Sequence, residues 1–179
     1  MKDNAEKPYV RLGNNTYIAP TAYVGGDVVL GDDCTVMHHV TIRGDISPIR
    51  IGMRCNIQDG TVVHTRAGVP LELGDEVIVG HRAVVHCRRI GSRVLVGTGA
   101  IVLDDCEVGD DAVIAAGAVL PPGTVVPPGA VVMGIPGKVV RETGEADRER
   151  ARRIVASYCR LGRRHAAGEF PNVLEGRQS

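Results

Sequence analysis

An apolar residue recurs every six positions along most of this 179-residue chain. The pattern slips by three residues before Ile51, gains four before Leu73 and loses one before Ile90. A period of six does not fit an amphipathic helix, which repeats every 3.6 residues, but it fits a short strand followed by a turn. We therefore expect a coiled chain in which each repeat residue points inward. The nineteen repeat positions are Ile18, Val24, Leu30, Val36, Ile42, Ile51, Ile57, Val63, Leu73, Val79, Val85, Ile90, Val96, Val102, Val108, Ile114, Leu120, Val126 and Val132.

The composition agrees with a narrow core built from small side chains. Aromatic residues make up 3% of the chain, and it has no Trp. The fourth residue after a repeat position is usually small, and Cys34, Cys55 and Cys106 occupy this place. We expect these three cysteines to fill the core.

The repeat resembles that of the hexapeptide-repeat, left-handed parallel β-helix, a prism with three faces and three repeat units per coil. The resemblance implies a mainly β fold of about six coils over residues 11–141, and it also implies the left-handed coiling. The repeat stops near Arg141, and apolar residues at helical spacing within 142–167 predict one C-terminal α-helix that packs along the prism or along a neighbour. Residues 1–10 and 168–179 are expected to be terminal tails.

Counting three units per coil predicts which polar side chains stack. Residues one coil apart lie about 4.8 Å from each other. The count places Arg43, His64 and His86 in one column, and it places Asp59 and His81 in a column on a different edge. His81 can then meet a His64–His86 pair only in a neighbouring chain, and three-fold symmetry closes such an arrangement. Three imidazoles with an open fourth position are a ligand set of catalytic zinc sites.

Several short motifs lie around these histidines and beyond them. They are Ile42-Arg43-Gly44-Asp45, Asn56-Ile57-Gln58-Asp59-Gly60, Gly80-His81-Arg82-Ala83, Val85-His86, Ala115-Ala116-Gly117-Ala118 and the segment 134–141. In this order they resemble the γ-class carbonic anhydrase family, over about residues 10–141. The resemblance implies a homotrimer with a metal ion at each interface, bound by His64 and His86 of one chain and His81 of the next. It implies zinc, with iron or cobalt as alternatives, and the reversible hydration of carbon dioxide to bicarbonate.

The resemblance also implies roles for five other residues. Arg43 and Asp45 match an ion pair at the subunit interface. Asn56, Gln58 and Asp59 match residues that line the site, with Gln58 placed to hold the reactive water and Asp59 to brace the interface.

Two departures from the family pattern bear on turnover. The best-characterised active members carry a glutamate directly after the Arg-Gly-Asp motif and an acidic loop after the first histidine, which together relay protons. This chain has Ile46 after the motif, and Glu72 is the single acid of its short loop. Without a relay, proton release should limit turnover.

Three further residues near the motifs were weighed as ligands. For His38 and His39 we expect interface or surface roles rather than metal binding. Cys87 follows His86, and its place beside the metal as a further ligand or an oxidation-sensitive thiol stays open as the less favoured alternative.

Three other functions stay open, one of which is a thioesterase or other hydrolase that uses the same metal-bound hydroxide. A hexapeptide acyltransferase would use acetyl-coenzyme A and a single histidine as general base, but the three histidines and the four-residue insertion count against it. A non-enzymatic trimeric scaffold that keeps the metal and has lost turnover would explain the missing relay acids.

Charge and composition exclude other classes. Lys and Arg number 21 and Asp and Glu number 21, so the chain lacks the basic excess of a nucleic-acid-binding protein. No segment reaches the roughly 18 apolar residues of a membrane span. The N-terminus lacks a secretory signal, and five irregularly spaced cysteines do not form a disulfide framework. We therefore expect a cytoplasmic protein that binds neither nucleic acid nor membrane.

Overall fold

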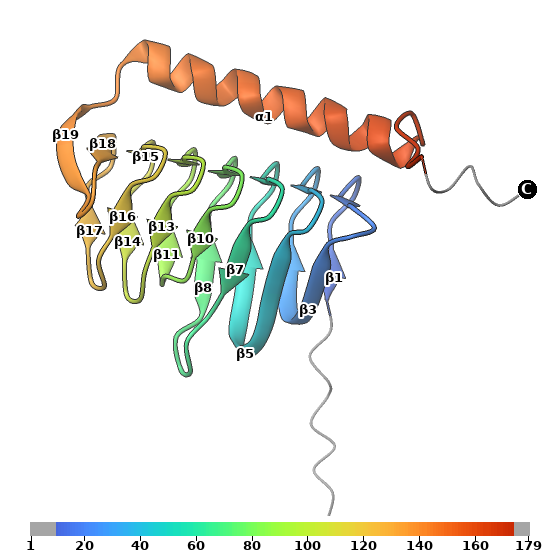
Figure 1. The fold of residues 1–179 in the computed structure, drawn as a ribbon, viewed down its shortest axis with the longest axis horizontal. Coiled ribbons are helices and arrows are strands. Elements are labelled where there is room, and N and C mark those ends of the chain that lie inside the picture. The colour runs from blue at the N-terminus through green and yellow to red at the C-terminus, as the bar shows by residue number, and fades with distance from the viewer. Residues whose placement is uncertain (1–9, 174–179) are drawn as a thin grey trace, which may run out of the picture.

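The computed structural model describes residues 10–173 and is a left-handed solenoid of short parallel strands with one long helix beside it (Figure 1). The fold class predicted from the repeat is therefore confirmed. In each turn the chain passes over three faces, and each strand pairs with the equivalent strands of the turns before and after it. The tails predicted at 1–10 and 168–179 fall largely outside the described residues.

One face, which we call the helix-covered face, lies under α1 (Glu145–Ala166). Its parallel strands are β2 (Tyr17–Ile18), β4 (Thr35–Val36), β6 (Asn56–Ile57), β9 (Ile78–Val79), β12 (Leu95–Val96), β15 (Val113–Ile114) and β18 (Ala130–Met133). β19 (Lys138–Glu142) adds to β18 in the antiparallel sense and leads into α1. Seven stacked strands make about seven turns, so the expected six coils were one too few. The first turn begins at Leu12, which pairs with Leu30 and precedes the repeat series that starts at Ile18.

The second face, which we call the apolar face, carries an uncharged row of outward side chains. Its strands are the first halves of β3 (Tyr23–Leu30) and β5 (Thr41–Ile51), then β7 (Val62–His64), β10 (Val84–Val85), β13 (Ile101–Val102) and β16 (Val119–Leu120). The residue before each inward one points outward, because side chains alternate along a strand. The outward row is Tyr23, Thr41, Val62, Val84, Ile101 and Val119.

The third face, which we call the charged face, differs sharply in its outward row. Its strands are β1 (Arg11–Leu12), the second halves of β3 and β5, β8 (Leu71–Leu73), β11 (Arg89–Ile90), β14 (Glu107–Val108) and β17 (Val125–Val126). Arg50, Glu72, Arg89 and Glu107 follow one another on consecutive turns with alternating charge. This face is thus suited to contact with water.

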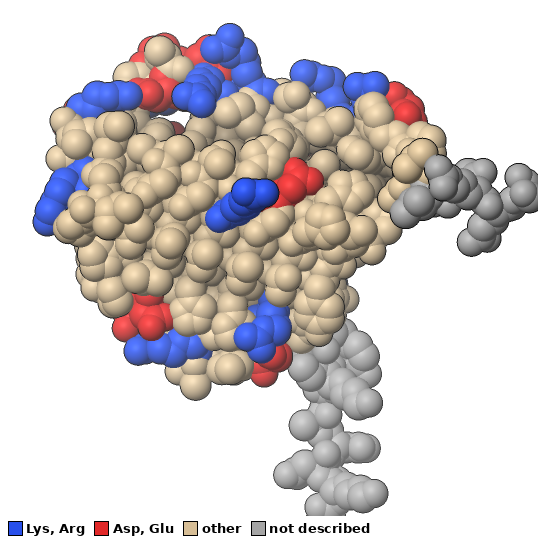
Figure 2. All heavy atoms as spheres, viewed as in Figure 1, with Lys and Arg blue, Asp and Glu red and all other residues tan. Residues whose placement is uncertain are grey.

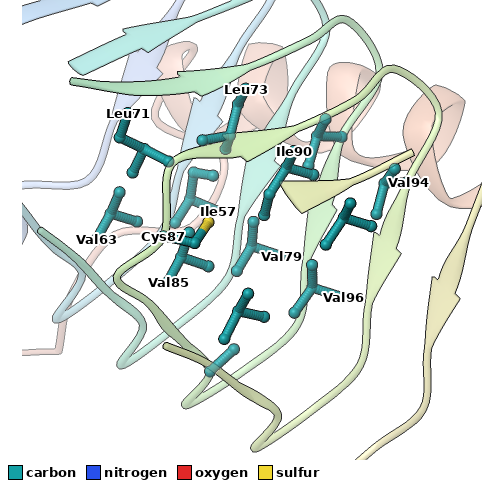
Figure 3. Close-up of a cluster of buried hydrophobic side chains, with 14 of the residues drawn as sticks. Ile57, Val63, Leu71, Leu73, Val79, Val85, Cys87, Ile90, Val94 and Val96 are labelled. Atoms are coloured by element: carbon teal, nitrogen blue, oxygen red, sulfur yellow. The ribbon is translucent and has the colours of Figure 1, made fainter. Parts of the chain in front are cut away.

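The inside of the prism is filled by the repeat residues, several of which Figure 3 shows pointing toward one another. Cys34, Cys55 and Cys106 are buried among them, as predicted, and their thiols donate hydrogen bonds to backbone carbonyls of the next turn. Small inward side chains suit this narrow core because each coil leaves room for little more than one layer of atoms.

α1 packs along its own prism. Ala151 and Val155 are buried against Ile78, and further along the helix the Arg163 guanidinium lies 2.9 Å from the Asp33 carboxylate. The helix begins after Gly144, whose backbone N–H donates to the Asp147 carboxylate at 2.9 Å. Of the two alternatives for this helix, the structure has the intramolecular one. No helix among residues 10–173 combines the length and the apolar character that crossing a membrane requires.

Candidate metal centre

The predicted histidine column lies on the edge where the apolar face turns into the charged face, here called the first edge. Arg43 in β5 pairs with His64 in β7. Val63 pairs with Val85, so His64 and His86 are neighbours on consecutive turns, and their ring centroids are 5.2 Å apart. The two side chains are 15% and 28% exposed. Two imidazoles therefore lie side by side at the surface, within reach of one shared ion.

Asp45 belongs to the same edge and links two of these residues. Its Oδ2 accepts a hydrogen bond from Arg43 Nη1 at 2.7 Å, and its Oδ1 lies 3.2 Å from His64 Nε2. Desolvation raises the pKa of Asp45, but the hydrogen bonds from Arg43 and His64 outweigh it, so the pKa lies below its ordinary value. The carboxylate is thus negative at neutral pH and turned toward the histidine pair.

The other predicted site residues lie on the edge between the helix-covered and apolar faces, here called the second edge. His81 Nδ1 is 3.0 Å from Asp59 Oδ2. Gln58 Nε2 donates to Asn56 Oδ1 at 3.1 Å, and both amides are buried. Asn56 Nδ2 is buried without a partner among the described residues. This edge therefore carries one imidazole, a carboxylate and a buried polar pair with an unused donor.

In a single chain, the site residues of the first edge and those of the second edge lie apart. Arg43, Asp45, His64 and His86 lie on the first edge, and Asn56, Gln58, Asp59 and His81 lie on the second, with the apolar face between them. Within residues 10–173 of a single chain, no three His, Cys, Asp or Glu side chains are grouped so as to hold a metal ion. The two edges thus present two halves of the predicted constellation.

One residue of the first edge was missed by the sequence analysis. Asp104 Oδ1 lies 2.5 Å from His86 Nδ1. Asp104 stands two positions after Val102, one turn beyond His86, so it is offset from the histidine column by one residue. The spacing alone signalled an acid nearby, but not that its carboxylate reaches the ring.

The residues present fit a metal ion with imidazole ligands. Nδ1 of His86 faces Asp104 and Nδ1 of His81 faces Asp59, so Nε2 of each ring is left for a ligand. Metal-binding histidines usually donate a hydrogen bond from their second ring nitrogen to a carboxylate or carbonyl in this way. His64 differs, because its Nε2 faces Asp45. Binding through that nitrogen requires Asp45 to turn toward Arg43.

Three hollows of the described surface lie elsewhere. Two of them, of 320 and 340 Å³, run beside α1, since Ala151 and Val155 line the first and Ile154 lines the second. A third, of 370 Å³, lies on the charged face beside Glu72 and Arg89. Gln58 lines the second of them, but none of the three site histidines lines any of the three. The His64 and His86 side chains, 15% and 28% exposed, thus lie at the surface of the single chain and outside these hollows.

Comparison with known proteins places this geometry in a family. The family model described as dynactin subunit 5 matches residues 9–161. A protein of Geobacillus kaustophilus named carbonic anhydrase is 41% identical over 157 residues, which cover 88% of this chain and 86% of that protein. A protein of Methanocaldococcus jannaschii named probable carbonic anhydrase is 46% identical over 150 residues, covering 84% and 94%. The chain belongs to the γ-carbonic-anhydrase-like family of hexapeptide-repeat proteins.

A solved structure of this family's fold carries a different name. A Bacillus cereus protein described as a candidate acetyltransferase is 36% identical, with a TM-score of 0.87, and the match covers 90% of this chain and 94% of that one. Family membership therefore supports an enzyme-like protein. The names of its relatives point to two different reactions, carbon dioxide hydration and acetyl transfer.

As a γ-carbonic-anhydrase-like protein, the chain differs from the family pattern where the sequence analysis expected. Ile46 follows Asp45 and is 53% exposed. The loop after His64 is held close to the prism, because Thr65 Oγ1 donates to the Ser47 carbonyl at 3.1 Å. Glu72 lies opposite Arg50 and Arg89 of the neighbouring strands on the charged face. No acid of this loop reaches the histidine pair among the described contacts.

Packing bears on Cys87 and His38, two of the further residues near the motifs. Cys87 is buried with 3% exposure and points into the core beside Val85 (Figure 3), where burial raises the pKa of its thiol. Its side chain is therefore directed away from the edge that carries His86. His38 Nδ1 lies 2.9 Å from Thr21 Oγ1, and its ring contacts His165 of α1. It thus has a role within the chain, between the prism and the helix.

Proposed function

We propose that this protein catalyses metal-dependent, reversible hydration of carbon dioxide at sites shared between the subunits of a homotrimer. The observation that carries the proposal is the division of the constellation over the two edges of the apolar face. The first edge holds His64 and His86 and the second holds His81, so neither edge alone supplies the three ligands of a catalytic zinc site. In the proposed site, His64 and His86 of one chain bind the ion with His81 of the partner subunit.

The apolar face supports an assembly of this kind. It separates the two edges, its outward row has no charge, and Val62 at its centre is 39% exposed. Figure 2 shows the corresponding broad area free of Lys, Arg, Asp and Glu below the helix, interrupted by one pair of opposite charges. Contact between the first edge of one chain and the second edge of the next is head-to-tail, and a three-fold axis closes it.

A bound zinc ion would supply the nucleophile by lowering the pKa of water to about 7, which is the known behaviour of carbonic anhydrases and not a result of this structure. The chain's own residues would bind the ion and orient the attacking water. Gln58 uses Nε2 on Asn56, so its Oε1 is free to accept a hydrogen bond from the attacking water. In the proposed reaction the oxygen of that water would add to the carbon of carbon dioxide to give bicarbonate, and the proton that the water loses would pass to buffer.

The absent relay shapes the expected rate. With Ile46 in place of an acid and no acidic loop side chain near His64, the proton leaves by way of water or buffer alone. We expect turnover that rises with buffer concentration.

The non-enzymatic scaffold remains the second candidate because of this missing relay. The similarity to the Bacillus cereus protein is the observation that keeps an acyltransferase as the third. The free thiols of all five cysteines fit a cytoplasmic location.

Mixed trimers test the shared site. His81→Ala and His86→Ala chains, each expressed alone, should lose zinc and carbon dioxide hydration in stopped flow. Co-expressed, they form mixed trimers in which a His64–His86 pair from one variant meets His81 from the other, so part of the zinc and activity should return. If each variant alone keeps stoichiometric zinc, the shared site is wrong. If zinc returns in the mixed trimers without hydration activity at any buffer concentration, the scaffold replaces the enzyme, and binding of acetyl-coenzyme A would favour the acyltransferase.

A further inference from the structure

Asp104 makes the shortest polar contact of the first edge. Its Oδ1 lies 2.5 Å from His86 Nδ1, and the two residues follow consecutive strands, β13 and β10, of the same face. The next residue, Asp105, turns to a different partner, because its carboxylate lies 2.9 Å from Arg66 Nη2. Two adjacent aspartates thus make separate contacts, one with the histidine column and one with the loop after β7.

The Asp104 contact determines which ring nitrogen of His86 carries hydrogen. An ionised carboxylate can only accept hydrogen bonds. A nitrogen at hydrogen-bond distance from it must therefore donate, which places the hydrogen on Nδ1. In the neutral ring Nε2 then keeps its lone pair, and a metal ion requires that lone pair.

We propose that Asp104 is the positioning residue of the metal site, which holds His86 in the Nδ1–H tautomer with Nε2 directed outward for the ion. The inference rests on the proposed function for its consequence, but the tautomer itself is a property of the single chain. It adds to the site a residue outside the family motifs that the sequence analysis used.

The second edge repeats the arrangement independently. Asp59 Oδ2 faces His81 Nδ1 at 3.0 Å, again the δ nitrogen and again a carboxylate from the preceding or following turn. Two of the three proposed ligands are thus oriented by an aspartate one turn away. His64 lacks such a partner on Nδ1 among the described contacts, since its neighbour Asp45 faces Nε2. The orientation of His86 consequently determines where the pair on the first edge can bind an ion.

The test compares Asp104→Ala with Asp105→Ala, a neighbouring control that removes a carboxylate which contacts Arg66 and not the histidine column. Long-range proton–nitrogen NMR on the metal-free protein reports the tautomer of each histidine. In the wild type and in Asp105→Ala, His86 should be the Nδ1–H form. In Asp104→Ala the Nε2–H form should appear, and zinc affinity from chelator competition should fall by about 10- to 100-fold.

The measurements test the role of Asp104 and the proposed function separately. If His86 keeps the Nδ1–H form in Asp104→Ala, or if zinc affinity stays unchanged there, Asp104 does not position the ligand. If the wild type binds no zinc, the proposed function fails, while the tautomer comparison still decides what Asp104 does. Asp104→Leu, which is similar in size and has no hydrogen-bond acceptor, replaces the alanine variant if that variant does not fold. It should reduce the Nδ1–H population, and an unchanged population would overturn the proposal.

Discussion

Gly162 of α1 and Thr35 of β4 approach so closely that a Cβ added at Gly162 would lie 2.3 Å from Thr35 Cγ2. No heavy-atom contact of that length is tolerated without movement. The helix backbone therefore lies close against the prism at this point, and the side chain of Arg163, the next residue, contacts Asp33. The position of α1 along the helix-covered face depends on the absence of a side chain at residue 162.

The close approach predicts a stability change and its rescue. Gly162→Ala should lower the free energy of unfolding by about 1–3 kcal/mol, because overpacking outweighs the roughly 1 kcal/mol gain in helix propensity. Thr35→Ser removes Cγ2, so adding it to Gly162→Ala should restore most of the loss. Denaturant unfolding of the two single variants and the double variant measures the effect. Additive losses would show that the two residues do not limit each other.

The uncharged outward row predicts which face forms the interface. Ile101→Glu places a charge in the middle of the apolar face, and burying it unpaired should weaken assembly by about 3 kcal/mol or more, a factor of about 100. Val125→Glu on the charged face is the control, since Val125 is 72% exposed. Sedimentation should show smaller species for the first variant alone. A full-size assembly in the Ile101 variant would place the interface on another face.

The histidine at the end of α1 predicts a pH dependence of stability. His165 stacks on Tyr17 and contacts His38 and Phe170. Burial, and then the charge of His38, lower its pKa from the ordinary 6.5, with Arg164 acting in the same direction and Asp59 against it. The unfolded chain then binds a proton more readily than the folded one. Proton binding by His165 therefore does not affect stability well above pH 6.5. As pH falls through 6.5 toward the lowered pKa, it reduces the free energy of unfolding by an increasing amount.

His165→Phe keeps an aromatic ring and removes the proton-binding group. Its free energy of unfolding should fall less than that of the wild type between pH 7 and pH 5, whereas the two should change in parallel above pH 7. Urea unfolding at several pH values measures the difference. Equal slopes below pH 6.5 would mean that His165 does not contribute to the pH dependence.

The cysteines predict a simple order of reactivity. Cys34, Cys55, Cys87 and Cys106 are buried, whereas Cys159 on α1 is half-buried. Burial raises the pKa of Cys87 and of Cys159, but only Cys159 borders on solvent. Alkylation followed by mass spectrometry should modify Cys159 first, and the other four thiols only after unfolding. Rapid modification of Cys87 in the folded protein would contradict its place in the core.

Much of the site arrangement was predictable because a regular repeat converts sequence distance into position. The pairing of Arg43 with His64, and the place of His81 beside Asp59, both follow from counting units. The prediction failed at the ends of the series. Leu12 begins a turn that the count omitted, although it stands one regular six-residue step before Ile18 and pairs with Leu30 one coil on.

The spacing of the six-residue units determined the solenoid, the inward row and the two histidine-bearing edges, because backbone hydrogen bonds between turns hold equivalent residues in register. The tertiary structure alone decided what lies off that register. Asp104 stands one position away from the histidine column, and the shape of its turn brings its carboxylate to His86. α1 carries no repeat to align it, so contacts with the prism, such as the packing of Val155 and the close approach at Gly162, decide which face it covers. By covering that face, the helix leaves the apolar face exposed between the two edges.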